Sequence, residues 1–365
     1  MHGGREWRLG FAGFGHVNRA LLRLLVERRR ELAARHGLRF KVTLVSGARR
    51  GALVDRRGID AGRLLRSGGP SWSSRVGLIE ALPAAPIDLL FEGTPLDPMR
   101  GEPATTHARL ALRRGVSVVS ANKGPVAFGA RPLRALAQRH GAGFRFEAAV
   151  ADCLPVFNLY ETALPVGRVL GARGVLNSTS NHVLQAVADG REPGRAVADM
   201  VRRGIAEADP SHDLDGWDQA VKIAILAQIL LGRRLRPADV VRIPFSQVDR
   251  RWLRRETRRG RRVHFVASVA QRGPARVAPV ALEPGTFLAT LSGTSLGLSL
   301  ETELAGRLNV SIDDPDVRQT AYAMLSDLIA IHHGRRLLPE TTMRHAPARP
   351  RRAPGRGKPR ARRRS

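Results

Sequence analysis

The sequence is poor in cysteine and in lysine, and each shortage has a consequence. Cys153 is the single cysteine among 365 residues, which excludes an internal disulfide and any metal site built from several cysteines. We expect it to be a small buried filler. Only four of the 61 basic residues are lysine, so arginine supplies the other 57. Because an amine can release a proton and a guanidinium cannot, the few lysines are candidates for chemistry.

Long apolar runs are also missing. No stretch reaches the roughly 20 apolar residues that a membrane span requires, and the N-terminal MHGGREWRLG enters a strand pattern without a secretory apolar core. We therefore expect a cytoplasmic protein with no membrane partner. With 365 residues, 43% of them hydrophobic, the chain is long enough to bury a large core and to form two domains.

Acidic residues are few as well, which leaves a net charge of +29. Such an excess normally points to nucleic acid or to an anionic membrane surface. Here arginine dominates along the whole chain, which indicates a compositional bias rather than one binding patch. Residues 341–365 contain no acid and no apolar periodicity. We predict that this arginine-rich tail is disordered and that the protein binds no specific nucleic acid, with non-specific contact to polyanions left open.

The N-terminal segment reads as a strand, a tight turn and a helix. Residues 8–13 form a short apolar run, and Gly13, Gly15 and Asn18 stand at the spacing of a G-x-G-x-x-G turn. Two glycines would let the backbone approach a pyrophosphate, whose charge the helix N-terminus meets. Similar turns also occur in α/β proteins that bind no nucleotide. The candidate cofactor contacts of this turn are Gly13, Phe14, Gly15, His16 and Val17.

The next predicted strand, residues 40–45, ends without an acid. An NAD site usually places Asp or Glu at this strand end for the ribose 2′-hydroxyl, whereas an NADP site tolerates arginine for the 2′-phosphate. Here Arg49 and Arg50 follow the strand. The segment therefore favours NADP(H) over NAD(H), with Arg49 as the candidate contact, although arginine is abundant everywhere.

Further short strands alternate with helices, as is typical of a doubly wound parallel sheet. The predicted strands are 87–91, 116–120 and 144–147, and the predicted helices are 104–114 and 131–140. Ligands bind beyond the carboxyl ends of such strands. The polar residues expected there are Thr94, Ser120, Asn122 and Lys123. Thr94 and Asn122 are equally compatible with plain turns, whereas Lys123 is one of the four lysines.

The stretch 204–222, GIAEADPSHDLDGWDQAVK, gathers acids before a lysine. The acids are Glu207, Asp209, Asp213, Asp215 and Asp218, and the lysine is Lys222. Asp218 and Lys222 are four residues apart and would share one face of a helix. Two interpretations stay open: carboxylates at a helix start with a surface ion pair, or a centre for proton transfer.

Five segments in this order resemble the homoserine dehydrogenase family: FAGFGHVN, VSVVSANKGPVA, FEAAVADCLPV, GVLNSTSNHVL and GIAEADPSHDLDGWDQAVKIAILA. The similarity covers residues 8–231, and QTAYAMLSDLI at 319–329 resembles the closing helix of the family. The resemblance implies an enzyme that interconverts L-aspartate 4-semialdehyde and L-homoserine with a nicotinamide cofactor, in the biosynthesis of threonine, methionine and isoleucine.

The resemblance also implies roles for single residues. Lys222 matches the proton donor and Asp213 a supporting acid, while Glu207 and Asp218 match substrate ligands. The matched cofactor contacts are Gly13, Gly15, Thr94, Lys123 and Gly204. A monovalent cation is held mostly by backbone oxygens, at the positions that here are Glu147, Val150, Asp152 and Leu154. Asp152 and Cys153 stand where the family usually has glycines.

For the fold, the resemblance implies an α/β architecture in two parts. Residues 1–150 would form a Rossmann-type domain with a doubly wound parallel sheet, completed by a closing helix at 316–335. Residues 151–315 would form an α+β catalytic and dimerisation domain with a mixed sheet, in which alternating segments at 262–269 and 287–291 are predicted strands. Pairing of two such sheets would give a homodimer. The chain stops without the regulatory domain of many relatives, so we expect no threonine feedback through one.

Between these parts, residues 173–184 read as a strand followed by a helix. The polar turn at 177–181 either caps that helix or, as in the family, faces the substrate. Ser178 stands where glycine is usual in the family.

Two other hypotheses stay open. A divergent oxidoreductase of the same fold would act on another small amino or hydroxy aldehyde and would keep Lys222. A noncatalytic nucleotide- or nucleic-acid-binding protein would use the arginine-rich tail and would not require Glu207, Asp218 and Lys222 together. The joint presence of those three residues favours the dehydrogenase.

Overall fold

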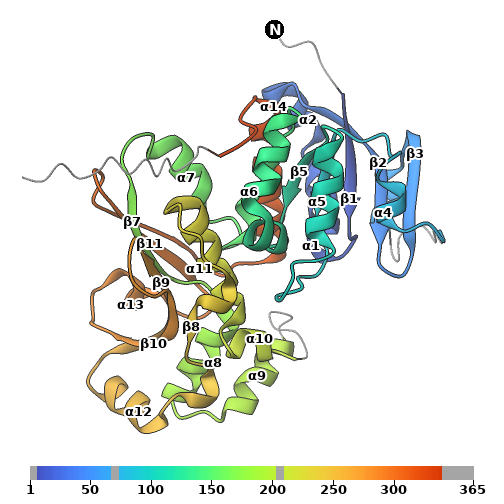
Figure 1. Cartoon of the computed structure of the whole chain (residues 1–365). Coiled ribbons are helices and arrows are strands. Elements are labelled where there is room, and N and C mark those ends of the chain that lie inside the picture. The colour runs from blue at the N-terminus through green and yellow to red at the C-terminus, as the bar shows by residue number, and fades with distance from the viewer. Residues whose placement is uncertain (1–5, 67–73, 203–208, 339–365) are drawn as a thin grey trace, which may run out of the picture.

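The computed structural model describes residues 6–66, 74–202 and 209–338. Two six-stranded sheets lie side by side, each with its own helices (Figure 1). The predicted disordered tail at 341–365 lies outside the described residues, as do Gly204 and Glu207. No helix in the described ranges is long and apolar enough to cross a membrane.

The first sheet has the strand order β3-β2-β1-β4-β5-β6. Its strands are β1 (Glu6–Ala12), β2 (Arg39–Gly47), β3 (Gly51–Ile59), β4 (Leu89–Glu92), β5 (Ser117–Ser120) and β6 (Phe144–Arg145). Neighbouring strands are parallel except β2 and β3, which are antiparallel. The short central strands β4 and β5 are buried along their whole length, as expected when helices cover both faces. This is the predicted doubly wound Rossmann-type sheet.

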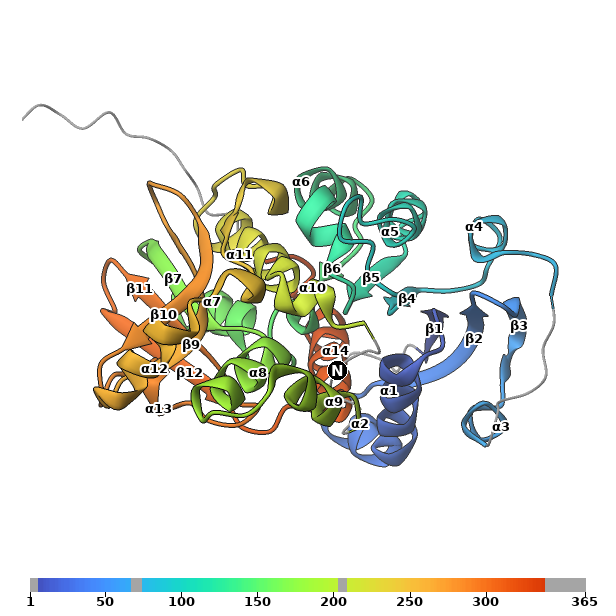
Figure 2. The ribbon, with the colours of Figure 1, turned by 90° about the horizontal axis from the view of Figure 1, so that it is seen from below.

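Helices cover both faces of this sheet (Figure 2). The pair α5 and α6 lies on one face, and α1, α2 and α14 lie on the other. Their bounds are α1 (His16–Glu27), α2 (Arg29–His36), α5 (Ala104–Arg113), α6 (Gly124–Arg139) and α14 (Val317–His332). Two short helices, α3 (Ala61–Leu65) and α4 (Leu78–Ala81), complete this part of the molecule.

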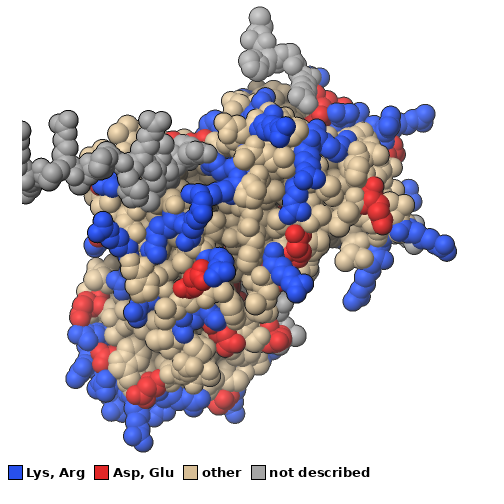
Figure 3. All heavy atoms as spheres, viewed as in Figure 1, with Lys and Arg blue, Asp and Glu red and all other residues tan. Residues whose placement is uncertain are grey.

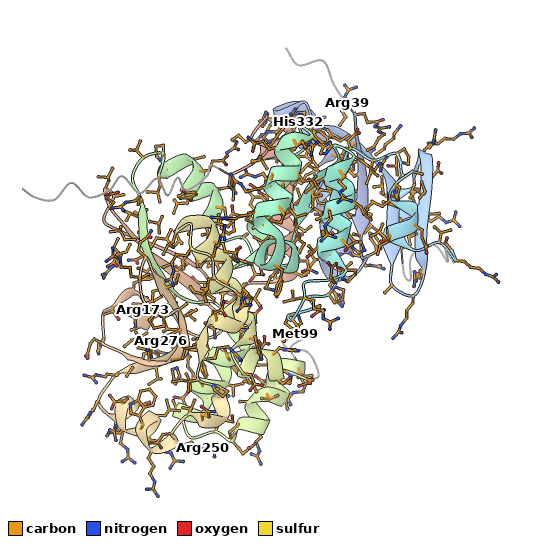
Figure 4. The ribbon with its side chains drawn as sticks, in the orientation of Figure 1. Arg39, Met99, Arg173, Arg250, Arg276 and His332 are labelled. Atoms are coloured by element: carbon orange, nitrogen blue, oxygen red, sulfur yellow. The ribbon has the colours of Figure 1, made fainter. Side chains whose placement is uncertain are left out.

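Helix α14 comes from the far end of the described chain and packs against α1. It is the predicted closing helix, and the Asp316 carboxylate caps its first turn by accepting from the Arg318 and Gln319 backbone N–H groups. Its apolar side chains share one core with β1 and α1. At its end lies His332, labelled in Figure 4. The Trp7 indole donates to His332 Nδ1 at 2.9 Å and so fixes the helix to the first strand.

The second sheet has the order β12-β11-β7-β9-β10-β8. Its strands are β7 (Val169–Val175), β8 (Val241–Arg242), β9 (Arg262–Ala270), β10 (Arg276–Leu282), β11 (Leu296–Thr302) and β12 (Arg307–Ile312). All pairs are antiparallel except β8 with β10, so the predicted mixed sheet is confirmed. The helices of this part are α7 (Val156–Ala163), α8 (Ser178–Ala188), α9 (Pro193–Arg202), α10 (Ser211–Leu214), α11 (Trp217–Leu230), α12 (Arg250–Arg258) and α13 (Phe287–Thr290). Three 3₁₀ turns occupy Glu147–Ala149, Pro237–Asp239 and Phe245–Gln247.

Two sequence predictions need correction, and one strand was missed. The strand predicted at 287–291 is wrong, because these residues form the short helix α13, whose buried Leu288 and the following Leu291 pack in a small core with β9 and β10. Strand β3 was not predicted, since its middle is charged and exposed and it pairs through its backbone at the sheet edge. Helix α6 begins at Gly124, well before the predicted start at 131, because Pro125 fits the first helical turn.

The arginine side chains spread over the whole molecule. On the face shown in Figure 3, basic side chains lie over both parts, with acidic side chains among them. The four arginines labelled in Figure 4 lie on separate elements: Arg39 on β2, Arg173 on β7, Arg250 on α12 and Arg276 on β10. This dispersion agrees with a compositional bias rather than one binding patch.

Candidate active site

The glycine turn between β1 and α1 has the geometry that a pyrophosphate requires. Gly13 has φ +74°, and a Cβ added there would lie 3.0 Å from the Gly93 carbonyl oxygen, so the position demands glycine. A Cβ added at Gly15 would meet no atom within 4 Å, which leaves open space in front of α1. The first turn of α1 carries no acid to oppose an anion. The turn therefore fits a dinucleotide, with Phe14, His16 and Val17 around it.

Asn18, in place of the third glycine, ties the strand to the helix with its side chain. Its buried amide Nδ2 donates to the Ala12 carbonyl at 3.0 Å and to the Gly13 carbonyl at 2.5 Å. A Cβ on Gly93 would lie 2.7 Å from this Nδ2, so a larger residue there would displace the Asn18 amide. The amide thus replaces close strand–helix packing with two hydrogen bonds.

Two residues at the end of β2, Ser46 and the predicted Arg49, differ in exposure. Ser46 is buried and accepts from the Gly13 N–H at 3.3 Å. Arg49 is exposed in the turn that leads to β3, and it forms no ion pair with a described residue. No acid occupies the strand end, in line with the sequence prediction.

A cavity of about 260 Å³ opens where the carboxyl ends of β4 and β5 face α11 and α14. It brings together residues predicted for three different roles: Val17, Thr94, Lys123, Val150, Asp152 and Lys222. Cofactor turn, candidate cation segment and predicted proton donor therefore border one space. Cys153, next to Asp152, packs against the core but is only half-buried, at a separate hollow between α1 and α14, so the expected small filler is partly exposed.

The acid–lysine stretch supplies a compact ionic cluster at this cavity. Lys222 Nζ lies 2.7 Å from Asp218 Oδ2 and also donates to the Leu176 carbonyl. Lys123 Nζ approaches the other oxygen of Asp218 at 3.3 Å. One carboxylate thus joins lysines from two parts of the chain, the end of β5 and the middle of α11. The alternative of a surface ion pair is wrong, because the Lys222 side chain is only 12% exposed and the Asp218 side chain 15%.

The environment fixes the charges of this pair. Burial opposes the Lys222 ammonium, but the nearby carboxylates, Asp218 above all, together raise the pKa of Lys222 above its ordinary value. Burial also opposes ionisation of Asp218, yet Lys222 and Lys123 hold the pKa of that carboxyl well below its usual range. The pair is therefore an ammonium and a carboxylate at neutral pH.

Asn177 connects Asp218 to the second predicted acid, Asp213. Its Nδ2 donates to Asp213 Oδ1 at 2.8 Å and to Asp218 Oδ2 at 3.0 Å. Its Oδ1 accepts the Ser180 N–H at 2.8 Å and so caps α8. The cap fixes which way the amide faces, because the oxygen is committed to the helix and the nitrogen must face the acids. Burial and the Asp218 charge raise the pKa of Asp213.

The other strand ends are held by a buried network. Glu92 accepts from the Thr94 N–H at 2.8 Å and from its hydroxyl, and its second oxygen lies 2.8 Å from His107 Nδ1. Asn122 Nδ2 donates to the Thr94 carbonyl at 2.9 Å, and Asn122 Oδ1 accepts the Gly124 N–H at 2.7 Å.

Ser120, predicted as a cofactor contact, is fully buried below this network. Its hydroxyl donates to the Asn122 carbonyl at 2.7 Å, so it supports the loop from inside the sheet. Lys123 and Thr94 line the cavity, whereas Ser120 does not.

The candidate cation segment lies beside a second group of buried acids. Both oxygens of Glu147 accept backbone N–H groups, from Phe157 at 2.9 Å and Asn158 at 2.8 Å. Burial and the nearby Asp327 raise the pKa of Glu147 to about 8. No group of three or more His, Cys, Asp and Glu within the described ranges could hold a metal. A cation at this segment would therefore depend on backbone oxygens.

For Asn122 and for the turn that contains Asn177, the sequence left a site role and a plain turn or cap role both open. Their signal was a polar turn after a predicted strand. Asn122 donates to Thr94, 28 residues away, and Asn177 donates to Asp213, 36 residues away, so spacing in the sequence could not reveal these contacts. Leu176 contributes through its backbone carbonyl, for which its side chain gives no signal.

Comparison with known proteins agrees with this geometry. The homoserine dehydrogenase family model matches residues 155–329. The NAD(+)-dependent homoserine dehydrogenase of Pseudomonas canavaninivorans is 35% identical over 339 residues, which cover 90% of this chain and 96% of that protein. The chain belongs to the homoserine dehydrogenase family.

Other members of the homoserine dehydrogenase family extend the match. A homoserine dehydrogenase of Methanocaldococcus jannaschii is 30% identical over 88% of this chain and 97% of its own length. The crystal structure of a putative homoserine dehydrogenase from Archaeoglobus fulgidus has a TM-score of 0.80 at 28% identity, covering 89% of this chain and 99% of that one. The predicted family and the predicted fold class are both confirmed.

Proposed function

We propose that this chain catalyses the reversible reduction of L-aspartate 4-semialdehyde to L-homoserine with a nicotinamide cofactor. The observation that carries the proposal is the buried Lys222–Asp218 pair beside a cavity that the glycine turn also borders. Family membership supports the same reaction. When bound, the cofactor supplies the hydride, and the protein has to supply the proton and stabilise the charge that develops on the substrate oxygen.

Lys222 is the proposed proton donor. As the aldehyde carbon gains a hydride, negative charge develops on its oxygen, and an ammonium can both stabilise that charge and transfer a proton to it. The raised pKa keeps Lys222 protonated before the reaction. Asp218 and the Leu176 carbonyl hold its Nζ in place. In the oxidation of homoserine the same amine has to be neutral so that it can accept the hydroxyl proton.

Asp218 is a proposed polar partner of the substrate, and Asp213 is the proposed supporting acid near Lys222. A carboxylate accepts charge-assisted hydrogen bonds from an α-ammonium or a hydroxyl group. Asp218 lies beside both lysines, and Asn177 holds Asp213 next to it. Glu207 remains a proposed substrate ligand outside the described residues.

The cofactor residues present fit a dinucleotide, with the pyrophosphate at Gly13 and Gly15 and the nicotinamide among Thr94, Lys123 and Val150. We further propose a preference for NADP(H). The exposed Arg49 and the missing acid at the end of β2 support it. The relative from Pseudomonas canavaninivorans is named as NAD(+)-dependent, so the two cofactors have to be compared directly.

A homodimer through the second sheet is also proposed. Helices α8 and α11 pack on one face of this sheet. The other face carries Arg173, Ser268 and Ser299 around a hollow of about 770 Å³. A second copy of this face could fill that hollow, and two-fold pairing is the commonest form of oligomer. The molecular mass in solution tests this assignment.

The deciding experiment follows the absorbance of NADPH or NADH during reduction of aspartate semialdehyde. Oxidation by the wild type that is lost in Lys222→Ala supports the reaction, and the faster cofactor settles the Arg49 argument. No turnover with either cofactor, from protein shown to be folded, overturns the homoserine assignment and directs the search to other small aldehydes.

A further inference from the structure

Asp152 has a backbone conformation that an ordinary side chain avoids. Its φ is +52°, and Asp314 at +44° is the other non-glycine residue with a positive φ among those described. Such conformations cost free energy and persist where the surrounding structure holds them. The Thr320 hydroxyl, on α14, donates to Asp152 Oδ1 at 2.6 Å and holds the carboxylate in place.

The carboxylate of Asp152 lies at the cavity where we propose that the nicotinamide binds. Asp152 lines the cavity together with Thr94, Lys123, Val150 and Lys222. Its charge also reaches the proton donor: burial and Asp218 have the larger effects on the pKa of Lys222, but Asp152 contributes to raising it. Asp152 therefore lies close enough to the reacting region to act on it electrostatically.

Asp152 is the one acid among the described residues that line this cavity, where Lys123 and Lys222 supply two positive charges. Asp218, bonded to both lysines, and Asp213, next to Asp218, do not line it. Without Asp152, the charged side chains that line the cavity would all be positive and would disfavour any cation that entered.

The two forms of a nicotinamide ring differ by one such charge, because the oxidised ring is a cation and the reduced ring is neutral. We propose that Asp152 is a specificity-determining residue that favours binding of the oxidised nicotinamide over the reduced one. The inference rests on the proposed function in one respect, the presence of the nicotinamide in this cavity. With the two lysines alone, the cavity would bind the oxidised ring less tightly than the reduced ring, and Asp152 is expected to reduce that difference in affinity. The equilibrium of the reaction in solution stays unchanged.

The test compares binding of NAD⁺, NADH, NADP⁺ and NADPH to the wild type and to Asp152→Asn by calorimetry, without substrate. Asn has the same shape, tolerates a positive φ and can still accept from Thr320. We expect the dissociation constants of the oxidised forms to rise about tenfold and those of the reduced forms to change by less than about twofold, as a lost charge–charge interaction in a partly buried site implies.

The matched control is Asp314→Asn. Asp314 also has a positive φ and also accepts from a threonine hydroxyl, Thr294 Oγ1 at 2.9 Å, but it does not line this cavity. We expect no change in any of the four affinities. Asp152→Gly serves as a second charge-removing variant, because glycine adopts the backbone conformation freely, and the same asymmetry is expected from it.

Each outcome decides something. A selective loss of NAD⁺ or NADP⁺ affinity in both Asp152 variants supports the inference. Equal losses for oxidised and reduced forms, or no loss, overturn it and leave the proposed dehydrogenase standing. A folded wild type that binds none of the four nucleotides overturns the inference and the proposed function together.

Discussion

Two buried ion pairs in this molecule use different cations, and the difference separates chemistry from structure. Lys222 pairs with Asp218 beside a cavity and retains some exposure. Arg145 pairs with Asp327 and Glu161, and its side chain is 1% exposed. In a chain that uses arginine for 57 of 61 basic residues, a lysine stands in the pair beside the cavity, where we propose proton transfer, and an arginine stands in the fully buried pair.

The arginine cluster is saturated with hydrogen bonds. The guanidinium of Arg145 makes five: one to Asp327, two to Glu161, one to Asn158 Oδ1 and one to the Arg335 carbonyl. These partners come from α7, α14 and the segment after α14, so a single side chain joins three parts of the chain to β6. The lysine pair, in contrast, faces a space that a ligand can enter.

The largest expected effect is on turnover when Lys222 is replaced. We expect kcat to fall by about 10²–10⁴-fold in Lys222→Ala, and by a similar factor in Lys222→Arg, because a guanidinium keeps the charge but does not release a proton. Steady-state kinetics measures the loss. Lys41→Arg is the control, since Lys41 pairs with Glu6 on the first sheet, away from the cavity, and should lose nothing. Activity of Lys222→Arg within tenfold of wild type would contradict the proton role.

Removing Arg145 should act on stability instead. Arg145→Ala leaves Asp327 and Glu161 buried without their partner, and we expect a loss of about 3–5 kcal/mol in the free energy of unfolding. Arg145→Lys should also destabilise, because an ammonium cannot make the five hydrogen bonds. Denaturant titration measures both variants, and Arg168→Ala, which breaks an exposed pair with Glu303, should change little. Unchanged stability in Arg145→Ala would show that the cluster does not hold this junction together.

The pH dependence should separate the two directions of the reaction. Oxidation of homoserine needs neutral Lys222, and the pKa of Lys222 is raised, so the oxidation rate should climb about tenfold per pH unit as long as the pH is below that pKa. Reduction needs the ammonium and should be lost only as the pH rises through the same pKa. Rate profiles at saturating cofactor measure both. An oxidation rate that levels off near neutral pH would assign the proton transfer to another group.

The smallest effect concerns the amide that connects the acids. Asn177→Ser keeps a side-chain oxygen to cap α8 but loses the donor to Asp213 and Asp218. We expect the turnover rate to fall about tenfold or less, with the pKa of Asp213 rising further because the amide lowers it. Carboxyl NMR titration measures the pKa. Asp249→Ser, at the N-cap of α12, is the control for the helix cap alone. An unchanged Asp213 titration would show that Asn177 serves only α8.

Much of the fold could be predicted because apolar periodicity and turn residues are local features of the sequence. Strands β1, β2, β4 and β5 are short apolar runs that end at turn residues, and the closing helix repeats its apolar residues over four turns. Strand β3 was not predicted, because its exposed charged residues show no apolar alternation. Helix α13 was predicted as a strand, because the five residues FLATL are too few to tell one period from the other.

In the candidate site too, contacts within one helix could be predicted from the sequence, and contacts between distant segments could not. Lys222 and Asp218 could be paired from their spacing on one helix, since a helical turn brings positions four apart together. The approach of Lys123 to Asp218, and the amide of Asn177 between two acids, depend on how the two sheets pack, and no local pattern encodes that. Those contacts could be learned only from the folded chain.

The place of α14 has a consequence for synthesis of the protein. The part of the chain that contains β1 and α1 leaves the ribosome first, but the apolar surface that α14 covers stays open until residues 317–332 have been made. Thr320 and Asp327 on that helix also hold Asp152 and Arg145. The part built on the first sheet is thus begun first and finished last, and a nascent chain stopped before this helix would expose the core to aggregation.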